Sequence, residues 1–187
     1  MSRATDIADD AEVDANNHQQ YTWGPTDRNI TTWGGGTGPH ALLGSPAQPI
    51  NCWSYPILLA IRRGYLNRQG ALNLVQDLNL KSPSLKPYAF NTSDLTTMWT
   101  DWKDFPGSLW RPRRGDLVFF RSFMGGLLNH VAISTGRIHP MLGHSEIISF
   151  GEGRSTGGLA TVNRTSIELV MQTHHTEVKF IAPSWDH

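Results

Sequence analysis

The stretch that decides the fold runs from Gly115-Asp116-Leu117-Val118-Phe119-Phe120 to Asn129-His130-Val131-Ala132-Ile133. A loop that contains Gly125-Gly126 separates the two segments. Short runs of β-branched and aromatic residues between glycine-rich turns are typical of β-strands. Similar segments follow, and the sequence predicts strands over residues 117–121, 130–135, 146–150, 160–163 and 177–181. The second half of the chain is therefore expected to form an antiparallel sheet.

A helix is expected ahead of these strands, over about residues 52–63. Asn51 is a good N-cap for it, and Gly64 is a good stop signal. Pro56 complicates the start, because proline disfavours helical geometry at the residue before it and donates no hydrogen bond. The first turn is expected to be irregular, or the regular helix begins at Pro56.

Two more helices are predicted between this one and the strands. One covers residues 68–78, and the other follows an N-cap at Ser93. The second carries a stripe of apolar residues at helical spacing, Leu95, Met98, Trp99 and Trp102. Helices followed by antiparallel strands predict an α+β fold.

The length and charge of the chain narrow its class. At 187 residues the sequence fits one domain with a sizeable core. Its 16 basic residues balance 16 acidic ones, which argues against nucleic acid or an anionic membrane surface as a partner. The apolar runs are too short to cross a bilayer, so no membrane span is expected.

The first 40 residues differ in composition from the rest. They are rich in Asp, Asn and Gln and contain a glycine-rich segment over residues 33–39. Such sequence buries little apolar surface by itself. Residues 1–40 are therefore expected to form an arm that is flexible or draped over the domain through Trp23 and Trp33. Residues 41–187 are expected to form a single domain.

Cys52 is the only cysteine, so an intramolecular disulfide is excluded. It lies in Asn51-Cys52-Trp53-Ser54, directly before the apolar run of the first predicted helix. A helix N-terminus carries partial positive charge that favours a thiolate, which makes a nucleophile possible. Free cysteine is also among the most buried residue types, so inert packing in the core is the alternative.

A cysteine nucleophile needs a base within hydrogen-bond reach and a third group that orients the base. His130 is the best candidate for the base. It opens an apolar strand after a loop, where its side chain can face a cleft while Val131 and Ile133 anchor the backbone. A histidine on a strand can equally have a purely structural role.

These motifs, taken in order, resemble the NlpC/P60 and CHAP group of papain-like cysteine hydrolases. The similarity covers about residues 50–153 and rests on Asn51-Cys52-Trp53, on Pro112 to Phe120, and on Asn129 to Gly136. It implies N-terminal helices packed on an antiparallel sheet, with residues 41–187 as one papain-like catalytic domain. It also implies Cys52 as the nucleophile and His130 as the base. Asp116 is expected to be structural, holding a turn or a backbone amide.

The third catalytic group comes, in that family, from the strand after the histidine strand. Register against the apolar pair Ile147-Ile148 indicates Ser149 for this role. Serine departs from the residues usual there, and its hydroxyl orients an imidazole more weakly than a carboxylate or an amide does. If the strand is shifted, the alternatives are Glu146, Glu152 and His144.

The resemblance implies acyl transfer at an amide bond, without a metal or an organic cofactor. The first expectation is a peptidoglycan endopeptidase or amidase that acts as an antibacterial effector, with an immunity protein as a possible partner. Residues 1–20 hold no apolar segment of a cleavable signal. The effector is therefore expected to be secreted without a recognisable signal peptide, or to be cytoplasmic before export. The alternative is an effector that deamidates or cleaves a host protein.

An alternative of another class is a non-enzymatic metal-binding or interaction module. His130, His139 and His144 lie close in sequence and could bind zinc together with Cys52. The spacing matches no common zinc pattern, and Pro140 predicts a turn within it. The histidines near the chain end, His174 among them, are expected to be exposed.

Overall fold

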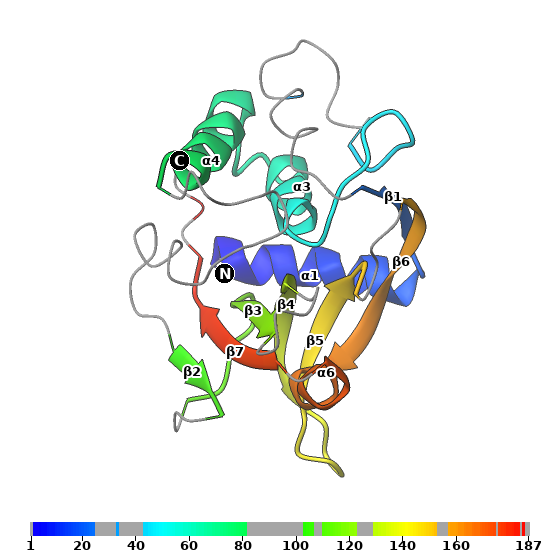
Figure 1. Ribbon diagram of the computed structural model, residues 1–187, viewed down its shortest axis with the longest axis vertical. Helices are drawn as coiled ribbons and strands as arrows, with labels where there is room; N and C mark the ends of the chain where they lie inside the picture. Colours follow the sequence, from blue (N-terminus) through cyan, green and yellow to red (C-terminus); the bar gives the residue numbers. More distant parts are fainter. Residues whose placement is uncertain are drawn as a thin grey trace.

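Seven described strands form one antiparallel sheet in the computed structural model of this protein (Figure 1). The strands are β1 (Gln20–Trp23), β2 (Lys103–Phe105), β3 (Leu117–Ser122), β4 (Asn129–Ile138), β5 (Ser145–Phe150), β6 (Gly158–Ser166) and β7 (Thr176–Ile181). Their order across the sheet is β1-β6-β5-β4-β3-β7-β2. The structure describes residues 2–24, 33, 43–81, 103–106, 110–122, 129–152, 157–174, 176–183 and 185.

The helices of the described residues are α1 (Arg3–Asn16), α3 (Ser54–Arg62), α4 (Arg68–Lys81) and α6 (Ile167–His174). The helices predicted over residues 52–63 and 68–78 are confirmed as α3 and α4. The one predicted after Ser93 lies outside the described residues. The five predicted strands are confirmed as β3 to β7, so the protein has the mixed α+β architecture that its sequence indicates.

The sheet separates two apolar cores. Leu117 and Phe119 of β3 point into a first core that contains the buried faces of α1 and α3. Val118 and Phe120 point the other way, into a second core that contains α6. This alternation follows from the pleat of a strand, which sends successive side chains to opposite faces. We call the two sides the α1 face and the α6 face (Figure 1).

Residues 3–23, within the arm expected to be flexible or draped over the domain, form a helix and an edge strand. Ser2 caps α1 by accepting a hydrogen bond from the amide of Thr5. A stripe of small and apolar residues then faces the first core: Ile7, Ala8, Ala11 and Ala15. β1 extends the sheet by pairing with β6. Trp23 and Trp33, the two residues through which draping was expected, are both buried in the first core.

Gly115 lets α1 approach the sheet closely. Its backbone adopts a φ of +87°, which glycine tolerates and other residues rarely adopt. A Cβ added at this position would overlap the carbonyl group of Ala4 in α1. The glycine of the Gly-Asp-Leu-Val-Phe-Phe segment therefore positions the N-terminal helix.

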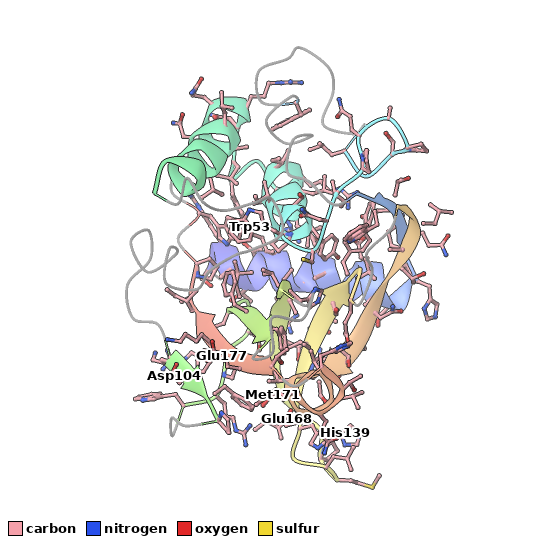
Figure 2. The ribbon with its side chains drawn as sticks, in the orientation of Figure 1. Trp53, Asp104, His139, Glu168, Met171 and Glu177 are labelled. Atoms are coloured by element: carbon pink, nitrogen blue, oxygen red, sulfur yellow. The ribbon has the colours of Figure 1, made fainter. Side chains whose placement is uncertain are left out.

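α6 covers the opposite side of the sheet. Ile167 and Val170 are buried in the second core, and Met171 packs against it from a half-buried position (Figure 2). The helix contacts β5, β6 and β7. Within the described residues, the helices are too short or too polar for any of them to cross a membrane.

Candidate functional site

Cys52 lies in the turn that leads into α3. The side chain of Asn51 accepts hydrogen bonds from the backbone N and the hydroxyl of Ser54, both at 2.8 Å. Asn51 thus holds the turn of Cys52 and Trp53 that precedes α3, whereas the N-cap residue of the regular helix is Trp53 and the helix begins at Ser54. Cys52 is partly exposed. Its position just before a helix N-terminus favours the thiolate form electrostatically.

His130 is the second residue of β4, and its ring lies on the α6 face. The ring centroid is 5.9 Å from that of Phe120, which belongs to the second core. The side chain of His130 is buried, with 3% of the residue exposed. Its Nε2 atom lies 2.8 Å from Oγ of Ser149. A buried imidazole is thus held by a hydroxyl on the neighbouring strand.

The surroundings of His130 keep its imidazole neutral. Burial lowers the pKa of His130 from its ordinary value of 6.5 to about 3, and the nearby charge of His174 acts in the same direction. At neutral pH the ring therefore carries one proton, with one nitrogen as a donor and the other as an acceptor. The same burial opposes the charged form of the ring.

Ser149 is the residue that the structure brings to His130, as the strand register predicts. It pairs with Ala132 across the sheet, two residues along from His130, so that both side chains share the α6 face. The alternatives for this role lie elsewhere. Glu146 forms ion pairs with arginines at the far end of β5, and Nδ1 of His144 lies 3.3 Å from the hydroxyl of Ser166.

Glu152 contacts Ser149 rather than replacing it. The hydroxyl of Ser149 donates to Oε2 of Glu152 at 3.3 Å. Oε1 of the same carboxylate lies 3.5 Å from Nε2 of His174 at the end of α6. His174 is thus half-buried and contacts Glu152, whereas exposure was expected near the chain end. α6 had no prediction from the sequence, so the position of His174 over β5 could not be foreseen.

The segment that carries Cys52 packs on the other side of the sheet from His130 and Ser149. Trp53, labelled in Figure 2, lies against Phe119 with ring centroids 6.1 Å apart. Tyr55 lies against Phe150 at 5.5 Å, and all four rings belong to the core on the α1 face. Phe119 pairs with Val131, the neighbour of His130, and Phe150 is the neighbour of Ser149. The start of α3 and the His130–Ser149 pair therefore meet the same end of the sheet from opposite faces.

The structure does not bring together the histidines that were considered as zinc ligands. His130 opens β4, whereas His139 follows the end of that strand, roughly 30 Å away at about 3.3 Å per residue. The amide of Leu142 donates to Nδ1 of His139 within the β4–β5 turn. In the part of the chain that the structure describes, no three His, Cys, Asp or Glu side chains gather in a way that could hold a metal ion.

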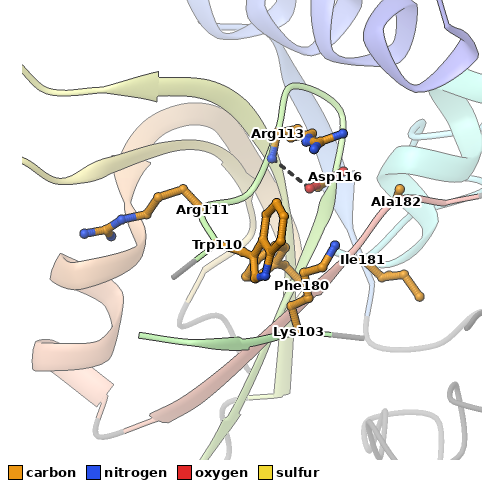
Figure 3. Close-up of a pocket in the computed structure, with 8 residues that line it drawn as sticks. All are labelled: Lys103, Trp110, Arg111, Arg113, Asp116, Phe180, Ile181 and Ala182. Carbon is orange, nitrogen blue, oxygen red and sulfur yellow. Dashed lines mark hydrogen bonds between the residues drawn. The ribbon is translucent and has the colours of Figure 1, made fainter. Parts of the chain in front are cut away.

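Asp116 has the structural role expected of it. Its Oδ2 atom accepts a hydrogen bond from the backbone N of Arg113 at 2.7 Å, which closes the turn before β3 (Figure 3). Asp116 also lines a small pocket of about 70 Å³ with Lys103, Trp110 and Phe180, among others. The pocket lies at the start of β3, whereas His130 pairs with Phe120 toward the end of that strand.

Comparisons with known proteins give no relative for this chain: no family model, no curated protein and no solved structure matches it.

Proposed function

We propose that the protein is a papain-like cysteine hydrolase of the NlpC/P60 and CHAP type that cleaves amide bonds. The observation that carries the proposal is the buried pair of His130 and Ser149, with Nε2 and Oγ 2.8 Å apart. A paired histidine on one strand and its partner on the next is what a thiol hydrolase of this type requires of its base. The capped turn with Cys52 packs at the same end of the sheet.

In the proposed reaction, Sγ of Cys52 attacks the carbonyl carbon of an amide while its proton passes to His130. The C–N bond then breaks, and His130 returns the proton to the leaving amine. Water hydrolyses the thioester and restores the thiol. The backbone N–H of Cys52 stabilises the oxyanion. The structure has the Cys52 segment and the His130 ring on opposite faces of the sheet, so the reaction requires the start of α3 and the start of β4 to move together at this end.

The proposed substrate is a peptidoglycan stem peptide or the amide that joins it to the sugar, and the proposed role is that of a secreted antibacterial effector. This assignment rests on the resemblance of the Cys52, Gly115–Phe120 and His130 motifs to the NlpC/P60 and CHAP group. The alternative substrate with the same chemistry is an amide of a host protein, which the test below separates by its products.

The test compares wild type with Cys52→Ala and His130→Ala on purified peptidoglycan and, separately, on a host-cell lysate. His139→Ala is the matched control, because it removes a histidine from the far end of β4. We expect wild type and the control to release new muropeptides, seen by mass spectrometry, and the first two variants to lose at least 10³-fold in rate. Mass gains of one dalton on lysate proteins would instead support the host-protein alternative.

Alkylation provides a readout that needs no substrate. A thiolate stabilised at a helix N-terminus should react with iodoacetamide rapidly near neutral pH, and the single cysteine makes the label unambiguous. A Cys52 that reacts no faster than a free model thiol, together with unchanged peptidoglycan and lysate, would refute the proposed hydrolase.

A further inference from the structure

The hydroxyl of Ser149 lies between the imidazole of His130 and the carboxylate of Glu152. Oγ is 2.8 Å from Nε2 of His130 and 3.3 Å from Oε2 of Glu152. A hydroxyl has one hydrogen to donate, and an ionised carboxylate can only accept. The hydrogen of Ser149 therefore points to Glu152, and Oγ is left as an acceptor for the imidazole.

This arrangement determines which ring nitrogen of His130 carries the proton. If Oγ accepts, then Nε2 must donate, so the neutral ring has its hydrogen on Nε2 and its lone pair on Nδ1. A serine alone would not impose this choice, because its hydroxyl can rotate and donate to Nε2 instead. The carboxylate of Glu152 prevents this rotation, because it accepts the hydroxyl hydrogen of Ser149.

We propose that Glu152 is a positioning residue that acts through Ser149 to keep His130 in the Nε2–H tautomer, with Nδ1 as the basic nitrogen. The inference deepens the proposed function, on which it rests, since it assigns Nδ1 as the atom that takes the proton of Cys52. Ser149 and Glu152, which the sequence offers as alternatives for one role, then act in series.

The same chain of contacts stabilises the charged ring during turnover. When Nδ1 takes a proton, the ring becomes a cation, and its Nε2–H bond to Ser149 strengthens because the donor is now charged. The negative charge of Glu152 lies one hydroxyl away and favours this cation. The arrangement corresponds in effect to the carboxylate that holds the histidine in Ser-His-Asp hydrolases, with a hydroxyl inserted between the two.

His174 is the further titratable group that faces this cluster. It comes from α6, the helix that covers this side of the sheet, and its Nε2 lies 3.5 Å from Oε1 of Glu152. The two oxygens of Glu152 are therefore used on different sides, one toward Ser149 and the other toward His174. Replacing His174 leaves the contact between Glu152 and Ser149 intact, which makes it a matched control.

The test reads the tautomer directly by long-range ¹H–¹⁵N correlation spectra of ¹⁵N-histidine-labelled protein at pH 7, with His130→Gln used to assign the signals. Protonated and unprotonated ring nitrogens have well separated ¹⁵N shifts. We expect Nε2–H in wild type and in His174→Gln. In Glu152→Ala, and in Ser149→Ala as a second variant, we expect the Nδ1–H form to appear. Wild type with Nδ1–H, or an unchanged Nε2–H ring in both variants, would overturn the inference.

A kinetic arm distinguishes this inference from the proposed function. If wild type hydrolyses its substrate, Glu152→Ala should lower kcat at least tenfold, with KM changed less than twofold, because the residue does not touch substrate. An unchanged kcat would refute the positioning role. If no hydrolysis is found at all, the proposed function fails, whereas the NMR spectra still decide whether Glu152 sets the tautomer.

Discussion

Two buried polar clusters lie against the sheet of this protein, one on each face, and they are built differently. On the α1 face, the carboxylate of Glu12 binds three arginines, Arg114, Arg137 and Arg164. On the α6 face, the ring of His130 has a hydroxyl as its partner. The first cluster pairs full charges, whereas the second surrounds a neutral base.

The pKa values of the two clusters express this difference. Burial acts to raise the pKa of Glu12, but hydrogen bonds from Arg114 and Arg164 and the charge of Arg137 outweigh it, and the pKa is lowered below its ordinary 4.5. Glu12 is thus ionised throughout the physiological range and ties α1 to the strands. His130 is kept neutral because burial opposes its charged form. One cluster therefore holds charges in ion pairs, and the other holds an uncharged ring.

The largest effect on stability is expected for Glu12→Ala, which removes the centre of the cluster on the α1 face. Because it leaves the arginines without their shared partner, we expect the free energy of unfolding to fall by about 3 kcal/mol. Urea denaturation followed by circular dichroism measures this. Asp10→Ala on the same helix is the control, since it removes a more exposed ion pair with Arg63 and should cost less than about 1 kcal/mol. Equal losses for the two variants would contradict the structural role given to Glu12.

A pH series sharpens the comparison, because the two groups act in different ranges. The unfolded state binds a proton on His130 below pH 6.5, whereas the folded state resists it until about pH 3. The contribution of His130 to the free energy of unfolding is therefore present above pH 6.5 and is lost as the pH falls. Between pH 6.5 and 5 the loss from this group is about 2 kcal/mol. The contribution of Glu12 is lost only as the pH falls below about 4.5.

Unfolding curves of His130→Gln and Glu12→Gln separate these contributions. We expect the first variant to lose much of the stability slope between pH 6.5 and 5, and the second to keep it. A wild-type slope that persists in His130→Gln would show that this ring is not the buried neutral group.

The smallest effect is expected for His174→Gln. Its contact with Glu152 is 3.5 Å long and partly exposed, so its loss should change stability by less than about 0.5 kcal/mol. The pKa of His130 should nevertheless rise, because the charge of His174 contributes to its lowering. Titration of the His130 ring signals by NMR measures this, and a pKa that stays the same or falls would be inconsistent with it.

The sequence predicts the second half of the fold better than the first, for physical reasons. From Leu117 onward, short runs of β-branched and aromatic residues predict strands, and the pair Ile147-Ile148 places Ser149 on the correct face. The sequence does not predict α1, because its buried stripe consists mostly of alanine among acidic residues and shows only a weak apolar periodicity. Its stabilising arginines lie about a hundred residues away in sequence.

The candidate site shows the same limit. The contact between His130 and Ser149 follows from strand register, which local sequence determines. Which face α3 covers depends on the packing of whole elements, so the side of the sheet that Cys52 approaches could not be read from its motif. The link from Glu152 to His174 depends on α6, whose short apolar segment between two strands gives no clear helical period.

The pairing of β1 with β6 has a consequence for the order in which the chain folds. Gln20 meets Thr161, so β1 is synthesised 141 residues before the residue that it pairs with. Contacts between such distant segments require the closure of a long loop and form late. Until β4, β5 and β6 have been synthesised, the apolar stripe of α1 therefore has no sheet to cover and stays exposed to other apolar surfaces.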